Sequence, residues 1–427
     1  MSSHPSWLLF AALLMLMQAG FGLLTTGLCR AKNAGQIISA NLMILAASLL
    51  AFWICGYAFL FGGHGFFFSP SATGAGSVPL FVIAALVVSI AAVIPAGAMA
   101  ERWSFKSIVL YGFWVGALPV AVFGHWVWGG GWLARLGQSC ALGHGVVDFA
   151  GSSVIHLAAG VIALAGSSIL GPRAGKYARD GRPKPMPGHN LVFVAIGTLL
   201  LFAGWFGFNS TPPFMDSGDQ LGVLALNTLL AGAAGGFAAY VTTVRKFGEP
   251  DPSMLSNGIL AGLVAISASC PFVNSTAAVL TGALAGFLVV YSVLLFEGRL
   301  KVDDPVGAIS VHGVSGAWGM ISLGLFANGS FGAGWNGHQT DTAVTGAFGE
   351  VFGAPSNDWS QLAAQCLGVV VCLLFIGAMA VVWFRISNLI TPLRVRREVE
   401  LGGLDLPETG ADCYPDFHLT DQGGTSA

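Results

Sequence analysis

The chain has 427 residues, of which 55% are hydrophobic and only 9% are charged, with a mean hydropathy of +0.75 and a formal net charge of −2. Soluble globular domains carry about 25% charged residues, so this composition excludes a water-soluble domain of this length. We therefore predict an all-α integral membrane protein, and we expect no nucleic-acid partner.

Apolar runs of roughly 20 residues, the length that a helix needs to cross a bilayer, set the predicted architecture. In chain order we predict eleven transmembrane helices, over residues 7–29, 40–62, 78–100, 107–128, 150–170, 190–209, 219–244, 255–271, 273–296, 308–326 and 360–386. With the N-terminus outside, 17 of the 18 lysines and arginines fall on the inner side, as cytoplasmic loops require. We therefore expect a membrane domain over residues 1–390 and a cytoplasmic C-terminal tail over 391–427.

At the outer end of the fourth predicted helix, Trp128 precedes the three glycines 129–131. Aromatic side chains at this depth usually anchor a helix at the membrane interface. Because no side chain follows Trp128, however, one indole face is unobstructed, and such a face attracts a cation with about 0.5 to 2 kcal/mol. The residues alone favour an anchor and leave a cation site as the alternative.

The fifth and tenth predicted helices each contain one histidine in a stretch that otherwise lacks ionisable side chains. Asp148 is placed to cap the outer start of the fifth helix, which puts His156 roughly 12 Å below it. Pro305 opens the tenth helix from the inside and puts His312 roughly 11 Å from that face. In a hydrocarbon core of about 30 Å, the two imidazoles are at similar depth and near enough to meet.

Titratable side chains inside a membrane usually mark a pathway, so we predict that His156 and His312 form a line of donor and acceptor nitrogens for a small neutral solute. Two alternatives stay open. Each histidine could instead bond a backbone carbonyl in a packed bundle, or the pair could ligate a haem, which a Soret band would reveal. The seven cysteines have no metal-ligand spacing, and we expect no metal site, no cofactor and no enzyme activity.

The sixth predicted helix ends outward in the aromatic segment Gly204 to Asn209. Plain packing would explain this cluster, but Phe208 could also block a narrow pore by steric occlusion and dewetting.

Short segments match between the two halves of the chain. They pair Ser153 to His156 with Ser310 to His312, and Ala19 to Gly22 with Ala203 to Gly207. The members of each pair are five helices apart, an odd offset that reverses the helix direction, so we predict an inverted five-helix pseudo-repeat with the transport site at the interface of the halves.

In these segments the chain resembles the ammonium transporter family (Amt/Mep/Rh), and the similarity extends over nearly its whole length. The matching segments are Gly27 to Asn33, Gly97 to Arg102, Trp128 with its glycines, Asp148 to His156, Gly204 to Asn209 and Val302 to Gly313. The resemblance implies a homotrimer of eleven-helix subunits in a cell (inner) membrane, each with its own ammonium pore. The segment Leu393 to Asp405 is similar to the family's cytoplasmic tail, which contacts the adjacent subunit and, in many prokaryotic members, supports regulation by a PII-type protein.

The resemblance also implies a role for individual residues. It implies twin pore histidines at His156 and His312, an outer cation-binding tryptophan at Trp128, a structural aspartate at Asp148, an inner gate phenylalanine at Phe208 and a neighbouring tryptophan at Trp205.

Three positions depart from the family. The family's outer gate phenylalanine falls on Val87, and a second aromatic residue of its recruitment site falls on Ile83. The serine that would hydrogen-bond the incoming cation falls on Pro212, although Ser210 or Thr211 could reach instead. We therefore expect weaker cation recruitment with an intact histidine conduit, or a divergent role such as sensing.

The expected function is ammonium transport. NH4+ binds at the outer mouth, because the bare ion would lose several kcal/mol or more on entering hydrocarbon. It then loses a proton, crosses as NH3 along the histidines and is reprotonated inside. The alternative is an ammonium receptor that binds without efficient conduction and signals through its tail.

Overall fold

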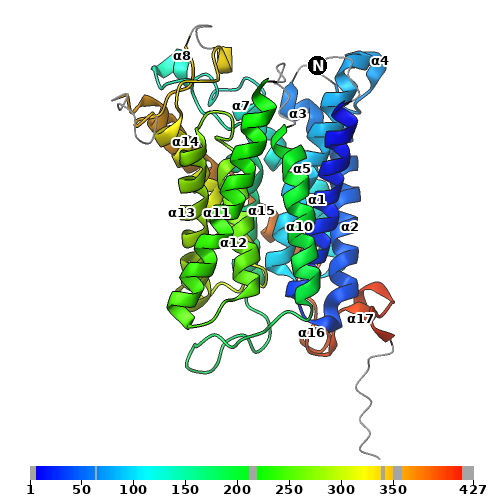
Figure 1. Cartoon of the computed structure of the whole chain (residues 1–427). Helices are drawn as coiled ribbons and strands as arrows, with labels where there is room; N and C mark the ends of the chain where they lie inside the picture. Colours follow the sequence, from blue (N-terminus) through cyan, green and yellow to red (C-terminus); the bar gives the residue numbers. More distant parts are fainter. Residues whose placement is uncertain (1–5, 63–64, 211–218, 338–341, 350–357, 416–427) are drawn as a thin grey trace, which may run out of the picture.

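The computed structural model describes residues 6–62, 65–210, 219–337, 342–349 and 358–415. In this part of the chain the regular structure is helical, with only three isolated β-bridges, and the helices stand side by side along a common axis (Figure 1). Ten helical spans of the described residues are long and apolar enough to cross a membrane. An all-helical, multi-pass membrane protein is therefore confirmed.

Most spans follow the predicted apolar runs, and two of the described spans contain two α-helices each. The helices of the ten spans are α1 (Ser6–Leu28), α2 (Ala34–Ala51) with α3 (Tyr57–Phe61), α5 (Val78–Met99), α6 (Phe105–Ala117) with α7 (Pro119–Val127), α9 (Ala158–Leu170), α10 (Leu191–Ser210), α11 (Asp219–Phe247), α13 (Ser275–Leu294), α14 (Ser315–Phe326) and α15 (Ser360–Ile390). Helices suit this solvent because a lipid-facing backbone must satisfy its N–H and C=O groups within its own segment.

One predicted span ends early. α12 (Pro252–Ile266) is shorter than the others, and the predicted range 255–271 overruns its far end. At the end of α12, the hydroxyl of Ser152 donates to the carbonyl of Val264, in the last turn, and accepts from the amide of Ala268, which follows the helix. Irregular backbone is tolerated here because it is buried in protein and bonded by a neighbouring helix rather than exposed to lipid.

Four spans contain a π-helical turn that the sequence did not signal. η2 (Phe52–Gly56) joins α2 to α3, η4 (Ser152–Leu157) leads into α9, η5 (Leu295–Arg299) follows α13, and η6 (Ile309–Val314) leads into α14. A π turn bonds residues five apart and so rotates all later side chains relative to an α-helix. The turns η4 and η6 contain the two histidines singled out in the sequence.

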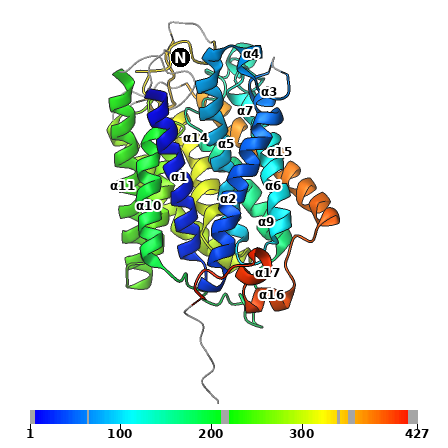
Figure 2. The ribbon, with the colours of Figure 1, turned by 90° about the vertical axis from the view of Figure 1, so that its right-hand side faces the viewer.

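The short helices gather at the two ends of the bundle. α4 (Pro70–Thr73) and α8 (Leu136–Cys140) lie at the end where α1 begins, the upper end in Figure 1. The helices α16 (Arg397–Gly402) and α17 (Asp405–Thr409) lie at the opposite, lower end (Figure 2).

The tail helices are bonded to the first helices of the bundle. The carboxylate of Asp405 accepts from the amides of Gly35 and Gln36, and that of Glu408 accepts from the amide of Phe105. The residues that precede α2 and α6 make no side-chain cap of their own. The tail therefore caps the N-termini of two helices, a favourable position for negative charge.

A buried ion network closes the same end of the bundle. The guanidinium of Arg173 donates to both oxygens of Asp303 at 2.9 Å and to Glu101 at 3.2 Å, and Arg30 also pairs with Glu101. Burial by itself would raise the pKa of Asp303, but the hydrogen bonds and charge of Arg173, aided by Arg102, lower that pKa to about 2. These charges are paired, as burial requires.

Candidate functional site

The structure brings the two predicted histidines into direct contact. Nδ1 of His156 lies 3.2 Å from Nδ1 of His312, and the ring centroids are 5.2 Å apart at an angle of 24°. Both side chains are buried, at 0% and 4% exposure. One nitrogen of this pair must donate and the other accept, so the contact holds one shared hydrogen.

Glycines let the two histidine-bearing helices touch. A Cβ atom on Gly160, one turn after His156, would lie 2.3 Å from Cα of Gly313, the residue after His312. A Cβ atom on Gly316 would lie 2.5 Å from a main-chain oxygen of η4. Real Cβ atoms are not found so close to backbone, so only glycine permits this crossing.

Aromatic rings flank the imidazoles on both sides. The indole of Trp205 stacks on His156 with centroids 5.1 Å apart, and the ring of Phe208 lies 5.3 Å from the same imidazole. The indole N–H of Trp205 donates to the hydroxyl of Ser267, which fixes its orientation. On the other side, the ring of Phe21 lies 5.9 Å from that of His312.

Phe21 is a site residue that the sequence analysis missed. A signal existed, because the repeat aligns the Ala19 to Gly22 segment of α1 with the Ala203 to Gly207 segment of α10. By that symmetry the aromatic residue after Gly20 occupies, beside His312, the position that Trp205 occupies beside His156.

Asp148 holds both the start of the helix that contains His156 and the indole of Trp128. Its carboxylate accepts five hydrogen bonds from residues 151–154, four from main-chain amides and one from the hydroxyl of Ser153. Its main-chain oxygen accepts from the indole N–H of Trp128 at 2.6 Å. Because the carboxylate is 0% exposed and occupied, we interpret Asp148 as a positioning residue rather than a direct cation ligand.

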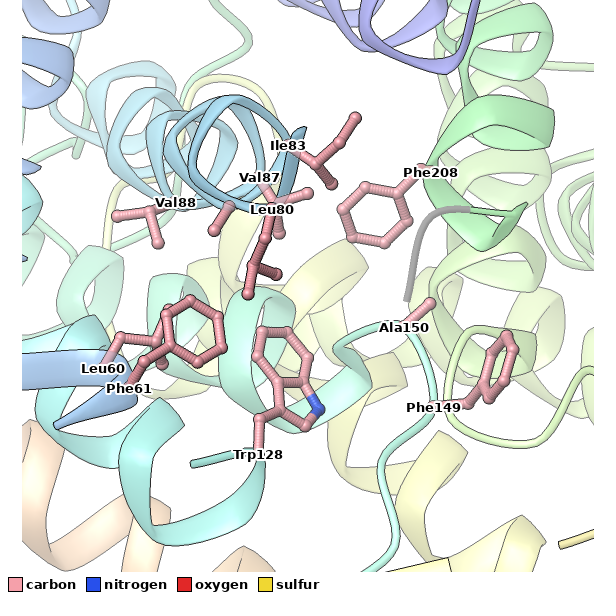
Figure 3. A pocket seen from close by; sticks show the side chains of 11 residues that line it. Leu60, Phe61, Leu80, Ile83, Val87, Val88, Trp128, Phe149, Ala150 and Phe208 are labelled. Atoms are coloured by element: carbon pink, nitrogen blue, oxygen red, sulfur yellow. The ribbon is translucent and has the colours of Figure 1, made fainter. Parts of the chain in front are cut away.

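A small apolar cavity lies between Trp128 and Phe208 (Figure 3). Its volume is about 30 Å³, and holding one water-sized molecule requires roughly 10 to 15 Å³. Its wall includes Ile83 and Val87 from α5, so both aliphatic departures lie where the resemblance put aromatic rings. The structure also adds Leu60 and Phe61 of α3, which the sequence did not single out.

A larger cavity lies on the other side of Trp128. It measures about 520 Å³, and Arg135, Trp335 and Asn336 contribute to its wall. Trp128 lines both cavities.

The two polar candidates at the end of α10 are only partly described. Ser210 is its last residue and is partly exposed. Thr211 and Pro212 lie outside the described residues, so the missing cation-binding serine stays an expectation.

The haem alternative does not fit this geometry. A metal ion between two imidazoles needs about 2 Å to each nitrogen, and a haem needs space for its ring as well. The Nδ1 atoms bond directly at 3.2 Å, and Trp205 and Phe208 pack on the outer side of His156. The histidines contact each other and aromatic side chains instead.

Long apolar helices around a buried pair of bonded imidazoles define the class, a multi-pass membrane protein. A sequence model of the Ammonium Transporter Family matches residues 6–414. The ammonium transporter Amt2 of Archaeoglobus fulgidus is 38% identical over 419 residues, which cover 96% of this chain and 87% of that protein. The ammonium transporter Amt1 of Haloferax mediterranei is 33% identical over 433 residues, covering 96% of this chain and 79% of that protein.

A solved structure of a sensor Amt protein is also similar, with a TM-score of 0.82 at 32% identity over 94% of this chain and 97% of that one. The chain belongs to the ammonium transporter family, and the family predicted from its motifs is confirmed.

Proposed function

We propose that the chain is an ammonium transporter that binds NH4+ at Trp128 and conducts NH3 past Phe208 and along His156 and His312, while the released proton crosses separately along the two imidazoles, so that each ammonium moves one net charge across the membrane. The observation that carries this proposal is the 3.2 Å contact between the two Nδ1 atoms in a buried setting. A donor must face an acceptor in that contact, so the pair is not two imidazolium ions. A hydrogen-bonding solute without charge suits such a pair.

The apolar cavity supports loss of the proton before passage. A cation that leaves water for apolar surroundings loses several kcal/mol or more, whereas neutral NH3 loses far less. NH4+ is held by the ring faces of the cavity and avoids this cost by giving up a proton before it passes Phe208. Na+ and K+ have no proton to give up, so the apolar interior beyond Phe208 excludes them.

An unpaired nitrogen supports a position for the neutral solute. Nε2 of His156 is buried and has no hydrogen-bond partner in the protein. Leaving a buried polar atom unpaired costs about 1 to 3 kcal/mol. An NH3 molecule beside Phe208 and Trp205 would complete that hydrogen bond as it passes.

For the membrane topology we propose eleven spans, with α12 as the eighth, and the upper end of the bundle outside. The lower end contains Arg30, Arg102 and Arg173, which suits a cytoplasmic face. The matching π turns η4 and η6 support an inverted repeat, with the site between the halves. Residues 1–390 form the membrane domain and 391–427 the cytoplasmic tail.

We further propose that three copies of the chain assemble in the cell (inner) membrane, with ammonium as substrate. A PII-type protein at the tail is the proposed regulator. Support for both comes from the family alone.

The test is electrical recording on proteoliposomes, with ammonium and potassium pulses compared. The wild-type protein should give currents with ammonium only, and His156→Ala or His312→Ala should abolish selective uptake of methylammonium. His189→Ala is the matched control, because that imidazole bonds Cys29 and Tyr414 at the lower end of the bundle. Wild-type flux in both pore variants would refute the conduit.

A second candidate is an ammonium receptor, favoured by the similarity to a sensor Amt protein and by the aliphatic residues Ile83 and Val87 in the cavity wall. It predicts saturable ammonium binding to the purified protein without ammonium-evoked current. Currents that saturate with ammonium decide for the transporter.

A further inference from the structure

The wall of the apolar cavity contains four aromatic rings, and one of them comes from an unexpected helix. α5 contributes only aliphatic side chains, among them Ile83 and Val87. The rings are those of Trp128 after α7, Phe149 before η4, Phe208 on α10 and Phe61 on α3. In Figure 3 the rings of Phe61 and Trp128 lie side by side below the α5 side chains, with Phe208 across the space from them.

The end of α3 is fixed against the segment that carries Trp128. Nδ1 of His125 donates to the main-chain oxygen of Leu60 at 2.9 Å. A Cβ atom on Gly129 would lie 2.2 Å from that same oxygen, so the two backbones are in contact. These contacts set the spacing between Phe61 and Trp128.

The direction of Phe61 is also determined locally. The π turn η2 precedes α3 and rotates its side chains relative to those of α2. Gly62, with a φ of 69°, ends the helix directly after Phe61. The ring of Tyr57 packs on that of Phe61 with centroids 5.1 Å apart. Phe61 is thus held by both its backbone and its ring.

We propose that Phe61 is a substrate-binding residue that completes, with Trp128 and Phe208, an aromatic site for ammonium and for its methylated analogue. α3 in this way supplies the ring that α5 lacks at Ile83 and Val87. This inference rests on the proposed function and names a further residue of the same site.

The chemistry of the wall defines the ligand. Ring faces attract a small cation, and no carboxylate lines this cavity within the described residues. The volume of about 30 Å³ is roughly twice that needed for one water-sized molecule, which fits a cation of one or two heavy atoms. Methylammonium therefore serves as the probe beside ammonium.

The test uses Phe61→Leu, which keeps an apolar side chain but removes the ring face, together with Phe61→Ala. Calorimetric titration of the purified full-length protein gives the Kd for ammonium and methylammonium, and proteoliposome currents give the KM. Both variants should weaken binding by about 2- to 30-fold, the range of a cation–ring contact. The control is Phe59→Ala on the same helix, because Phe59 is 36% exposed and does not line the cavity.

A rescue experiment separates recognition from folding. Val87→Phe places a ring on α5, so in the Phe61→Ala background it should restore the Kd to within about 3-fold of the wild type, because the contact is regained. In the wild-type background the same change fills the cavity and should lower methylammonium uptake relative to ammonium.

Phe61→Leu and Phe61→Ala with wild-type Kd values, or a double variant no better than Phe61→Ala, would overturn the role of Phe61. Either result alongside normal wild-type currents leaves ammonium transport intact. Wild-type binding without current would instead contradict transport, and the Kd comparison would still decide on Phe61.

Discussion

Gly160 and Gly313 bring the backbones of the two histidine helices into contact, with only 2.3 Å between a Cβ on the first and Cα of the second. Gly160→Ala must therefore push α9 and η6 apart and separate His156 from His312. We expect a cost of about 1 to 3 kcal/mol in stability and a loss of at least ~10-fold in ammonium current, measured by thermal melting and proteoliposome recording.

The matched control for this change is Gly377→Ala on α15. A Cβ atom there would lie 3.6 Å from a Val161 methyl group, which is ordinary contact. That variant should melt and transport like the wild type. Normal current from Gly160→Ala would show that the histidine contact does not depend on the crossing.

Asp148→Asn should damage the site through its geometry. An amide group has one acceptor oxygen, so some of the five donors around Asp148 would face an NH2 group instead. We expect a loss of roughly 2 kcal/mol or more, seen as a lower melting temperature in detergent. Asp180→Asn, in an exposed loop, is the control and should leave melting unchanged.

The buried pair of Arg173 and Asp303 predicts acid sensitivity. The pKa of Asp303 is about 2 in the folded protein, below its ordinary value of 3.8. A lowered folded-state pKa means that the ionised form stabilises the fold above about pH 4, and that this contribution of about 2 kcal/mol is lost as the pH falls toward 2. Asp303→Asn should thus melt below the wild type at pH 7, with the difference narrowing below pH 4. A difference that stays constant from pH 7 to pH 3 would contradict this linkage.

Asp405→Asn should loosen the tail. The change removes the charge that accepts from the first amides of α2, and a lost cap costs about 1 kcal/mol. Limited proteolysis should then cut after α15 roughly 5-fold faster, because about 1 kcal/mol corresponds to that ratio. Glu398→Gln on the exposed side of α16 should not change the cleavage rate.

The apolar runs predicted most spans because bilayer thickness sets their length, which is a local property of the sequence. The predicted end of α12 was wrong because the end of this helix depends on a contact between residues that are distant in the sequence. It depends on the hydroxyl of Ser152, a residue 112 positions away from its carbonyl partner, and no local pattern contains that bond.

The residues of the candidate site also fall into those that the sequence predicted and those that it did not. His156, His312, Trp128 and Phe208 stood out because their residue type is unusual for its surroundings. In the structure the two histidines bond each other, Phe208 contacts His156, and Trp128 lines the same cavity as Phe208. Phe61 did not stand out, because a phenylalanine in an apolar span is ordinary and its direction depends on the π turn η2.

The caps formed by the Asp405 carboxylate become available only late in synthesis. The amide of Gln36 bonds a carboxylate 369 residues later in the chain. At about 5 to 20 residues per second, that partner emerges roughly 20 to 70 s after α2 has been synthesised. The N-terminal amides of α2 must rely on water during this interval, so the bundle reaches its final bonding only when translation is almost complete.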